Sequence, residues 1–355
     1  MLLPISLSAK SIVGENGNVS IQRSDWEPDV LGAGFEQSTI DLGEDSEGPV
    51  VATLVRYLPP KGPSFLQNIG WKSSPIAQDT DVLYVHGWSD YFFQKNLAEY
   101  WQAQGAHFYA LDLRKYGRSI RPGQTPGFVD DLSVYDEEIE AALEVMGHGD
   151  GKEYSPRRLV LMGHSTGGLI FSLWAARNPG RIDALVLNSP WLEYQLTAAA
   201  RTVAAPVVGL QARLKPKAPM LSIDLGFYHR AVSKKLDGEW DFNDEWRPEH
   251  GFTVRPAWLS AILAGHAQVA KGLDIDVPVL TLLSTKSLLV PRWSDEMKRS
   301  DVAIDVNIVA ARALDLGKLV TIARIENAMH DVVLSEKPAR AKAFADISQW
   351  LKAYL

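Results

Sequence analysis

The chain contains no cysteine. Disulfides, thiol nucleophiles and cysteine-ligated zinc are therefore excluded, although the absence of thiols does not decide the compartment. Basic residues are not in excess either: 36 lysines and arginines face 43 acidic residues, giving a formal net charge of -7 without long runs of either sign. Because a polyanion needs a positive surface, we expect no nucleic acid among the partners of this protein.

Long apolar runs are also missing. The most apolar stretch, residues 198–210, is interrupted by Arg201 and Pro206 and stays short of the roughly 18 residues that a membrane span needs. The first residues have no basic start, and Pro4 and Ser6 interrupt their apolar stretch, so they do not fit a secretory signal. We therefore expect a cytoplasmic protein without a transmembrane segment, and the sequence leaves its oligomeric state open.

The 355 residues are 46% hydrophobic, which is enough for one large core or two modest ones. Two β-branched runs, residues 35–42 and 50–58, are joined by an acidic turn and predict an opening hairpin. Short apolar runs then alternate with segments of helical spacing, beginning with a strand at 81–87 and a helix at 92–104. Further strands are expected at 107–113, 158–163 and 183–188. Strands that are apolar on both faces are typical of a parallel sheet covered by helices on both sides.

The alternation stops between residues 190 and 274, where Ala-rich, Trp-rich and Pro-containing segments show no clear strand pattern. We interpret this segment as an inserted helical cap. Strand patterns return at 277–284 and 320–325, and a helix over 338–354 closes the chain. The predicted domains are an N-terminal leader over 1–34, an α/β core over 35–189 and 275–355, and a helical cap over 190–274.

The strongest local signal is the sequence Gly163-His164-Ser165-Thr166-Gly167, which fits G-x-S-x-G between an apolar strand and a helix. The backbone of such a turn is strained, and its flanking glycines let the strand and the helix approach closely while the hydroxyl points to open space. An ordinary Gly-rich turn with a capping serine is the alternative. The flanking pattern favours Ser165 as a catalytic nucleophile.

A serine nucleophile needs a base, which comes last when the chain order is serine, acid, histidine. The histidines that follow the serine are His229, His250, His266 and His330. Only His330 lies in a loop between a late predicted strand and the last helix, whereas the other three fall in the cap. We therefore predict His330 as the base, and we expect the side chain of His164 to point away from the nucleophile.

The acid is expected after the strand at 277–284, but the next three residues carry no carboxylate. The acidic residues considered are Asp295, Glu296, Asp301, Asp305 and Asp331. We choose Asp301, because it is followed by a predicted helix over 305–317, then a strand, and then His330, which is a suitable connection from acid to base. This choice implies an insertion of roughly fifteen residues before Asp301. Asp305 is the rival, and its alternative role is to cap the following helix. Asp331, next to the base, would have to bend back on itself.

The tetrahedral intermediate of acyl transfer needs preorganised N–H donors. One is expected at Thr166, directly after the nucleophile, and the other at Trp88, in the His-Gly-Trp-Ser-Asp loop after the strand at 81–87. A plain β-turn is the alternative for this loop. We expect His86 to support the loop rather than to react.

Several segments together match one known family: HGWSDY at 86–91, DLRKYGRS at 112–119, GHSTGG at 163–168, SDVAID at 300–305 and MHDVVLS at 329–335. On these segments the chain resembles the serine hydrolases that include monoacylglycerol lipases and bacterial lysophospholipases, a serine aminopeptidase-like group. With the strand pattern, the resemblance covers most of residues 35–355. It implies the α/β-hydrolase fold, with a mostly parallel eight-stranded sheet flanked by helices and a helical cap inserted after the sixth strand.

The resemblance also implies hydrolysis of acyl esters without a cofactor. Because the sequence shows no clustered set of histidines and carboxylates with ligand spacing, we expect no metal. It supports the same catalytic and oxyanion-hole residues that the motifs indicate: Ser165, Asp301, His330, Trp88 and Thr166. The chain departs from the family in two places. Relatives commonly have Arg-Gly-x-Gly-x-Ser where residues 114–119 read Arg-Lys-Tyr-Gly-Arg-Ser, which affects the wall of the site, and the acid lies beyond an inserted loop.

We expect the cap to select the substrate. Its stretches 198–210 and 220–228 are apolar enough to line an acyl pocket, and its tryptophans are candidates for the walls: Trp240, Trp246 and Trp258. The candidate substrate contacts are His86, His164, Trp191 and Trp258. The alternative is that these residues pack the cap on the sheet. Because the segment has no basic cluster for a phosphate group, we favour a neutral ester over a lysophospholipid.

These observations predict a serine hydrolase that cleaves carboxylic esters, such as a monoacylglycerol or a simple acyl ester, through an acyl-enzyme. Its partner would be a small-molecule or lipid ester. A lysophospholipase, acyltransferase, amidase or lactonase would use the same triad and stays an alternative. A nonhydrolytic binding protein on the same fold is disfavoured by the complete set of serine, histidine and acid, and an Asp-nucleophile enzyme by the serine at the elbow.

Overall fold

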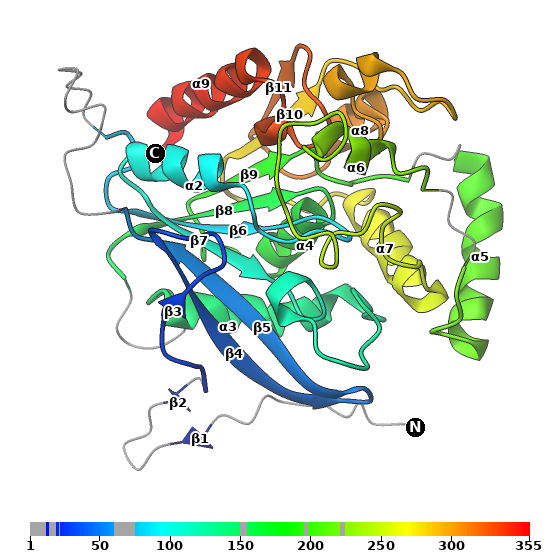
Figure 1. The fold of residues 1–355 in the computed structure, drawn as a ribbon, viewed down its shortest axis with the longest axis horizontal. Coiled ribbons are helices and arrows are strands. Elements are labelled where there is room, and N and C mark those ends of the chain that lie inside the picture. The colour runs from blue at the N-terminus through cyan, green and yellow to red at the C-terminus, as the bar shows by residue number, and fades with distance from the viewer. Residues whose placement is uncertain are drawn as a thin grey trace.

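A computed structural model of the chain describes residues 12–13, 19–20, 22–59, 75–149, 155–194, 198–220 and 224–355. Its main sheet has nine strands: β3 (Glu27–Pro28), β4 (Phe35–Asp45), β5 (Gly48–Tyr57), β6 (Thr80–Val85), β7 (His107–Asp112), β8 (Arg158–His164), β9 (Ala184–Asn188), β10 (Val279–Ser284) and β11 (Val320–Ile325). The spatial order is β11-β10-β9-β8-β6-β7-β5-β4-β3 (Figure 1). Neighbours run parallel from β11 to β7 and antiparallel from β7 to β3. Two short strands, β1 (Ile12–Val13) and β2 (Val19–Ser20), pair with each other.

The predicted count of eight strands is corrected to nine by β3. The strands β4 to β11 correspond to the eight that the sequence pattern predicts. Strand β3 has two residues, which pair with Glu36 and Gln37 at the edge of the sheet. Both residues of β3 are exposed, so no apolar alternation marks them in the sequence.

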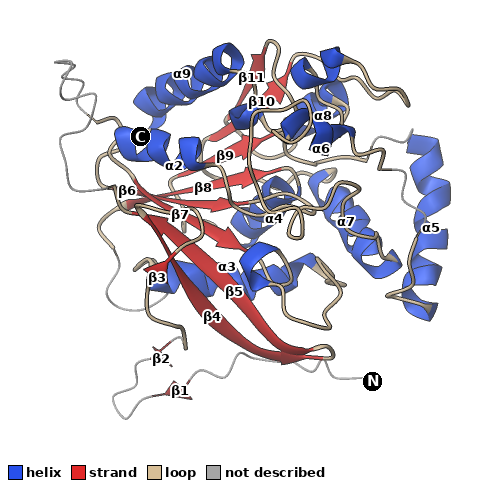
Figure 2. Cartoon of the chain, viewed as in Figure 1, coloured by secondary structure: helices blue, strands red, loops and turns tan. Residues whose placement is uncertain are grey.

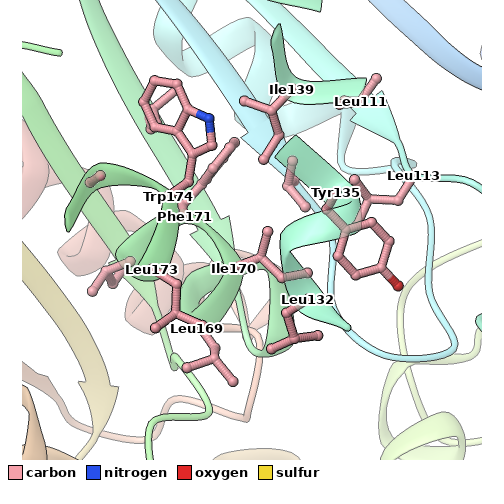
Figure 3. Close-up of a cluster of buried hydrophobic side chains, with 14 of the residues drawn as sticks. Leu111, Leu113, Leu132, Tyr135, Ile139, Leu169, Ile170, Phe171, Leu173 and Trp174 are labelled. Carbon is pink, nitrogen blue, oxygen red and sulfur yellow. The ribbon is translucent and has the colours of Figure 1, made fainter. Parts of the chain in front are cut away.

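The two faces of β6 contribute to different hydrophobic clusters, as the alternation of side chains along a strand requires. The helices that cover the sheet are α2 (Lys95–Ala103), α3 (Asp136–Val145), α4 (Thr166–Arg177), α8 (Val306–Ala313) and α9 (Lys337–Tyr354). Val82 and Tyr84 pack with residues of α2 and α9, whereas Leu83 and Val85 pack with residues of α3, α4 and α8. Figure 2 shows helices on both sides of the sheet, and Figure 3 shows part of the cluster formed by α3 and α4. The predicted parallel sheet between two helical layers is confirmed.

Between β9 and β10 the described residues form α5 (Ala198–Leu214), α6 (Phe227–Val232) and α7 (Pro256–Val269). Helix α5 packs on α7 (Figure 1). The ring of Trp258 on α7 lies 3.6 Å from that of Trp88, which follows β6, and His266 Nε2 lies 2.8 Å from the carbonyl oxygen of Trp191, which follows β9. Helix α7 therefore covers the ends of these two strands. The division of the chain into leader, core and cap stays a prediction.

Within the described ranges, no helix combines the length and the apolar character that a membrane span needs.

Candidate active site

Ser165 stands on the turn between β8 and α4. Its backbone has φ 51° and ψ -115°, a combination that non-glycine residues rarely adopt and that costs free energy. A Cβ built on Gly163 would lie 2.5 Å from the carbonyl oxygen of Gly167, and one built on Gly167 would lie 2.4 Å from that of His86. Larger residues at either glycine would push strand, helix and loop apart. The strained elbow with small flanking residues, predicted from the motif, is present.

His330 and Asp301 form a buried hydrogen-bonded pair. His330 Nδ1 lies 2.8 Å from Asp301 Oδ2, and the two residues are 3% and 0% exposed. The other carboxylate oxygen accepts the backbone N–H groups of Ala303 and Ile304 at 2.8 and 2.9 Å. The carboxylate is thus fixed by its own loop, and it favours the tautomer in which Nδ1–H donates to Asp301 and Nε2 is available to a nucleophile.

The segment before Asp301 leaves the sheet and returns to it. Ser287, just after β10, pairs with Asp301 in a parallel bridge, and the 3₁₀ helix η3 (Asp295–Arg299) lies between them. The rival acid, Asp305, has the alternative role: its Oδ1 accepts the N–H groups of Asn307 and Ile308 and so caps α8. The insertion that the sequence implies therefore brings Asp301, and not Asp305, to the histidine.

The loop after β6 lies directly against the elbow. A Cβ built on Gly87 would be 3.0 Å from both His164 Nδ1 and Ser165 Cβ. Trp88 follows this glycine, and Thr166 is the first residue of α4. Two chain segments that carry the predicted oxyanion donors thus meet at Ser165, while their role as donors stays a prediction.

His86 lies where a supporting residue would be, and its contact with a substrate stays a prediction. Its side chain is fully buried, with Nδ1 2.8 Å from the carbonyl oxygen of Gly87. Its Nε2 accepts the N–H of Leu113 at 3.2 Å. Both ring nitrogens are therefore occupied by backbone groups, and the ring ties the loop after β6 to the end of β7.

His164 is buried as well, with its ring centroid 5.0 Å from that of His330. Burial holds the pKa of His164 well below its usual range, and the neighbouring His330 and Arg247 lower it further, so the imidazole is neutral. At 1% exposure the ring packs beside the base, and its contact with a substrate stays a prediction.

The two tryptophans named as substrate contacts lie together. The rings of Trp191 and Trp258 are 6.1 Å apart, and Trp258 packs on Trp88. Trp258 is buried and Trp191 half-buried. This aromatic group joins α7 to the loop after β6, and its contact with a substrate stays a prediction. A different cap tryptophan, Trp240, donates its Nε1–H to the carbonyl oxygen of Leu334 at 2.7 Å, which is the packing role given as the alternative.

The sequence analysis missed a buried network that fixes the loop of the base. Asp331 accepts the side-chain amides of Asn188 at 2.6 Å and Gln94 at 3.1 Å, together with the N–H of Val333. Burial raises the pKa of the Asp331 carboxyl, and these hydrogen bonds act against the rise. The network ties His330 to the end of β9 and to the segment before α2. A polar Asn188 closing an otherwise apolar strand was the available signal.

The segment that departs from the family, residues 114–119, is held by ion pairs. Arg118 contacts the carboxylates of Asp29 and Asp112 at 2.6 and 2.7 Å and is 7% exposed. Lys115 is likewise buried, and its Nζ lies 2.6 Å from Asp45 of β4. Lys115, the one residue of this segment that departs from the family pattern, therefore ties the loop to β4.

The family model of serine aminopeptidase, S33, matches residues 77–334, which is more than half of the chain. The chain belongs to the serine aminopeptidase S33 family. A monoacylglycerol lipase of Mycolicibacterium smegmatis is 25% identical to this family member over 285 residues, covering 78% of the chain and 91% of the relative. A human protein, 1-acylglycerol-3-phosphate O-acyltransferase ABHD5, is 29% identical over 83 residues, covering 23% of the chain and 22% of the relative.

Solved structures agree on the fold of this S33 family member. A monoacylglycerol lipase from Paleococcus ferrophilus has a TM-score of 0.55 at 18% identity, covering 78% of this chain and 95% of that one. A soluble variant of monoglyceride lipase from Saccharomyces cerevisiae has a TM-score of 0.56 at 14% identity, covering 99% of this chain and 100% of that one. At these identities the likeness shows the fold alone. The predicted α/β-hydrolase fold and the predicted family resemblance are confirmed.

Proposed function

We propose that this protein is a carboxylic ester hydrolase with Ser165 as nucleophile, His330 as general base and Asp301 as the acid that orients the base. One observation carries the proposal: the 2.8 Å hydrogen bond from His330 to Asp301, in a chain whose Ser165 stands on a strained elbow. Membership of the S33 family and the similarity to a monoacylglycerol lipase support ester hydrolysis as the reaction.

In the proposed reaction, Ser165 Oγ attacks the ester carbonyl carbon and its proton passes to His330 Nε2. Negative charge moves to the carbonyl oxygen, where the N–H groups of Trp88 and Thr166 stabilise it. The intermediate collapses, the alcohol leaves with the proton from His330, and the acyl group stays on the serine. Water then attacks the acyl-enzyme in the same way, releasing the carboxylic acid. The carboxylate of Asp301 stabilises the imidazolium in both halves of the reaction.

For the substrate we propose a neutral acyl ester, such as a monoacylglycerol. Trp88 and Trp191, which are half-buried beside the buried Trp258, offer apolar surface next to the proposed oxyanion hole, which suits an acyl chain. The reaction needs no metal or cofactor, because the histidine and its acid supply the base. Acyl transfer to another alcohol and hydrolysis of an amide or lactone share the same acyl-enzyme and are the alternatives.

The test is a profile of hydrolysis across p-nitrophenyl esters of rising chain length, a monoacylglycerol, a lysophospholipid and an aminopeptidase substrate. The proposal predicts turnover of the neutral esters that exceeds turnover of the lysophospholipid and the amide. Cleavage of the aminopeptidase substrate without cleavage of any ester would contradict it.

A further inference from the structure

One stretch of the cap, residues 243–252, contacts the loop of residues 88–91 at successive positions. The contacts are two backbone N–H donations and one ion pair: Phe252 N to Ser89 Oγ at 3.0 Å, Asn243 N to Tyr91 Oη at 2.8 Å, and Arg247 Nε to Asp90 Oδ1 at 3.2 Å. Each residue after Trp88 in this loop thus has its own partner in the cap stretch.

The ion pair in the middle of this contact is buried. Arg247 is 3% exposed and Asp90 is 2% exposed. Two charges removed from water lose hydration that their attraction recovers only with excellent geometry, so a buried pair is a weak source of stability. A pair of this kind beside a candidate active site therefore suggests a role in positioning.

The pair is also linked to the base through two neighbouring side chains, Tyr228 and His164. The guanidinium of Arg247 lies 4.7 Å from the ring centroid of Tyr228, whose ring meets that of His330 edge-on at 5.3 Å. Asp90 Oδ2 lies 3.8 Å from Nδ1 of His164, which packs on His330. A substitution at the pair would therefore alter both the loop of residues 88–91 and the side chains that pack on His330.

The loop of residues 88–91 needs such a restraint. Ser89 has φ 51°, a strained value for a residue with a side chain, and it directly follows the proposed oxyanion donor Trp88. The loop also touches the elbow, because Gly87 packs on Ser165. A small movement of the loop would shift the Trp88 N–H relative to the nucleophile.

We propose that Arg247 is a positioning residue: through Asp90 it fixes the loop of residues 88–91, so that the Trp88 N–H faces the oxyanion of the transition state. This inference rests on the proposed function. It assigns the cap stretch a part in transition-state stabilisation, in addition to any contact that the cap makes with the substrate.

The experiment compares Arg247→Met, the double variant Asp90→Asn/Arg247→Met, and Arg230→Met as a matched control. Arg230 is a cap arginine whose side chain is 42% exposed and pairs with Asp237, whose side chain is 34% exposed. For each protein, kcat and KM are measured on a short p-nitrophenyl ester at pH 8, where the Asp90 carboxyl is ionised. Inhibition by a trifluoromethyl ketone, whose adduct with the serine carries an oxyanion, is measured at the same pH. Melting temperatures report stability.

Because one oxyanion donor is worth about 10²–10³ in kcat, we expect its misplacement in Arg247→Met to lower kcat by about 10- to 100-fold, with KM changed by less than about threefold. Inhibition by the ketone weakens by a similar factor. The double variant, which leaves no unpaired buried charge, recovers the melting temperature but not kcat. Arg230→Met keeps wild-type kcat.

Recovery of kcat together with stability in the double variant would show that the pair is merely structural and would overturn the inference. So would wild-type kcat in Arg247→Met, an equal loss in Arg230→Met, or unchanged ketone inhibition. The proposed function is checked separately with Ser165→Ala. Hydrolysis by that variant would refute the proposed function itself, whereas wild-type kcat in Arg247→Met refutes only the inference.

Discussion

Replacing Asp301 by asparagine tests whether Asp301 is the acid that orients His330, because the substitution changes only one of the two carboxylate oxygens that the structure uses. Its Oδ1 accepts two backbone N–H groups, from Ala303 and Ile304, so the amide oxygen of Asp301→Asn keeps that position. The amide NH₂ then faces His330 Nδ1, to which it cannot offer an acceptor. The imidazole is left in the wrong tautomer without charge stabilisation, and kcat is expected to fall by about 10⁴-fold.

Asp305 provides the matched control. Asparagine caps a helix about as well as aspartate, so Asp305→Asn should change neither kcat nor stability appreciably. Asp305→Ala removes the cap of α8 at a cost of about 1 kcal/mol. The shift in melting temperature is this free energy divided by the unfolding entropy, which is about 2.1 cal/mol/K for each of the 355 residues. The melting temperature should therefore fall by about 1 °C.

The assay is steady-state hydrolysis of a p-nitrophenyl ester by the three variants, with melting temperatures measured on the same preparations. A silent Asp305→Asn beside an active Asp301→Asn would refute the assignment of the acid. An Asp301→Asn variant that has lost its folded melting transition would show instead that the loop depends on the charge.

Three further predictions concern the elbow, a buried carboxyl and metals. Gly167→Ala should strongly lower both stability and activity, because its Cβ would lie 2.4 Å from the carbonyl oxygen of His86; an unchanged melting temperature and kcat would contradict the packing described for the elbow. Burial raises the pKa of Asp90 from 3.8 to about 7, so between these pH values the folded state keeps a proton that the unfolded chain loses, and stability falls as pH rises. Denaturant titrations from pH 4.5 to 8 should show this fall in stability in the wild type and not in Asp90→Asn. Dialysis against a chelator should leave activity unchanged, whereas a loss that a divalent ion restores would overturn the metal-independent mechanism.

Much of the fold is predictable from the sequence because its strands are buried on both faces. Short apolar runs such as β6 and β8 stand out from their surroundings, and the G-x-S-x-G motif lies between a strand and a helix as the elbow requires. Asp301 is predictable despite the insertion, because the chain must return to the end of β10 before it reaches α8. Strand β3 is not, since two exposed residues carry no pattern.

The residues that hold the loops of the candidate active site in place do so through contacts between distant parts of the chain, which no local sequence pattern encodes. Asp331 is bound by Asn188, 143 residues away, and by Gln94, 237 residues away. The partner of Asp90, Arg247, lies between β9 and β10, where a run of charged and aromatic residues gives no indication of which arginine turns inward. The burial of His86 and His164 is not predictable for the same reason: both flank the motifs in sequence, and long-range packing buries both rings.

The central claim is that Ser165 is the nucleophile of an ester hydrolase. The most direct measurement treats wild type and Ser165→Ala with a fluorophosphonate, identifies the modified residue by mass spectrometry, and compares ester hydrolysis by the two folded proteins. We expect a single adduct on Ser165 in the wild type, no adduct in the variant, and a loss of kcat of about 10⁴-fold or more. An adduct on another residue, or hydrolysis that survives Ser165→Ala, would contradict the account.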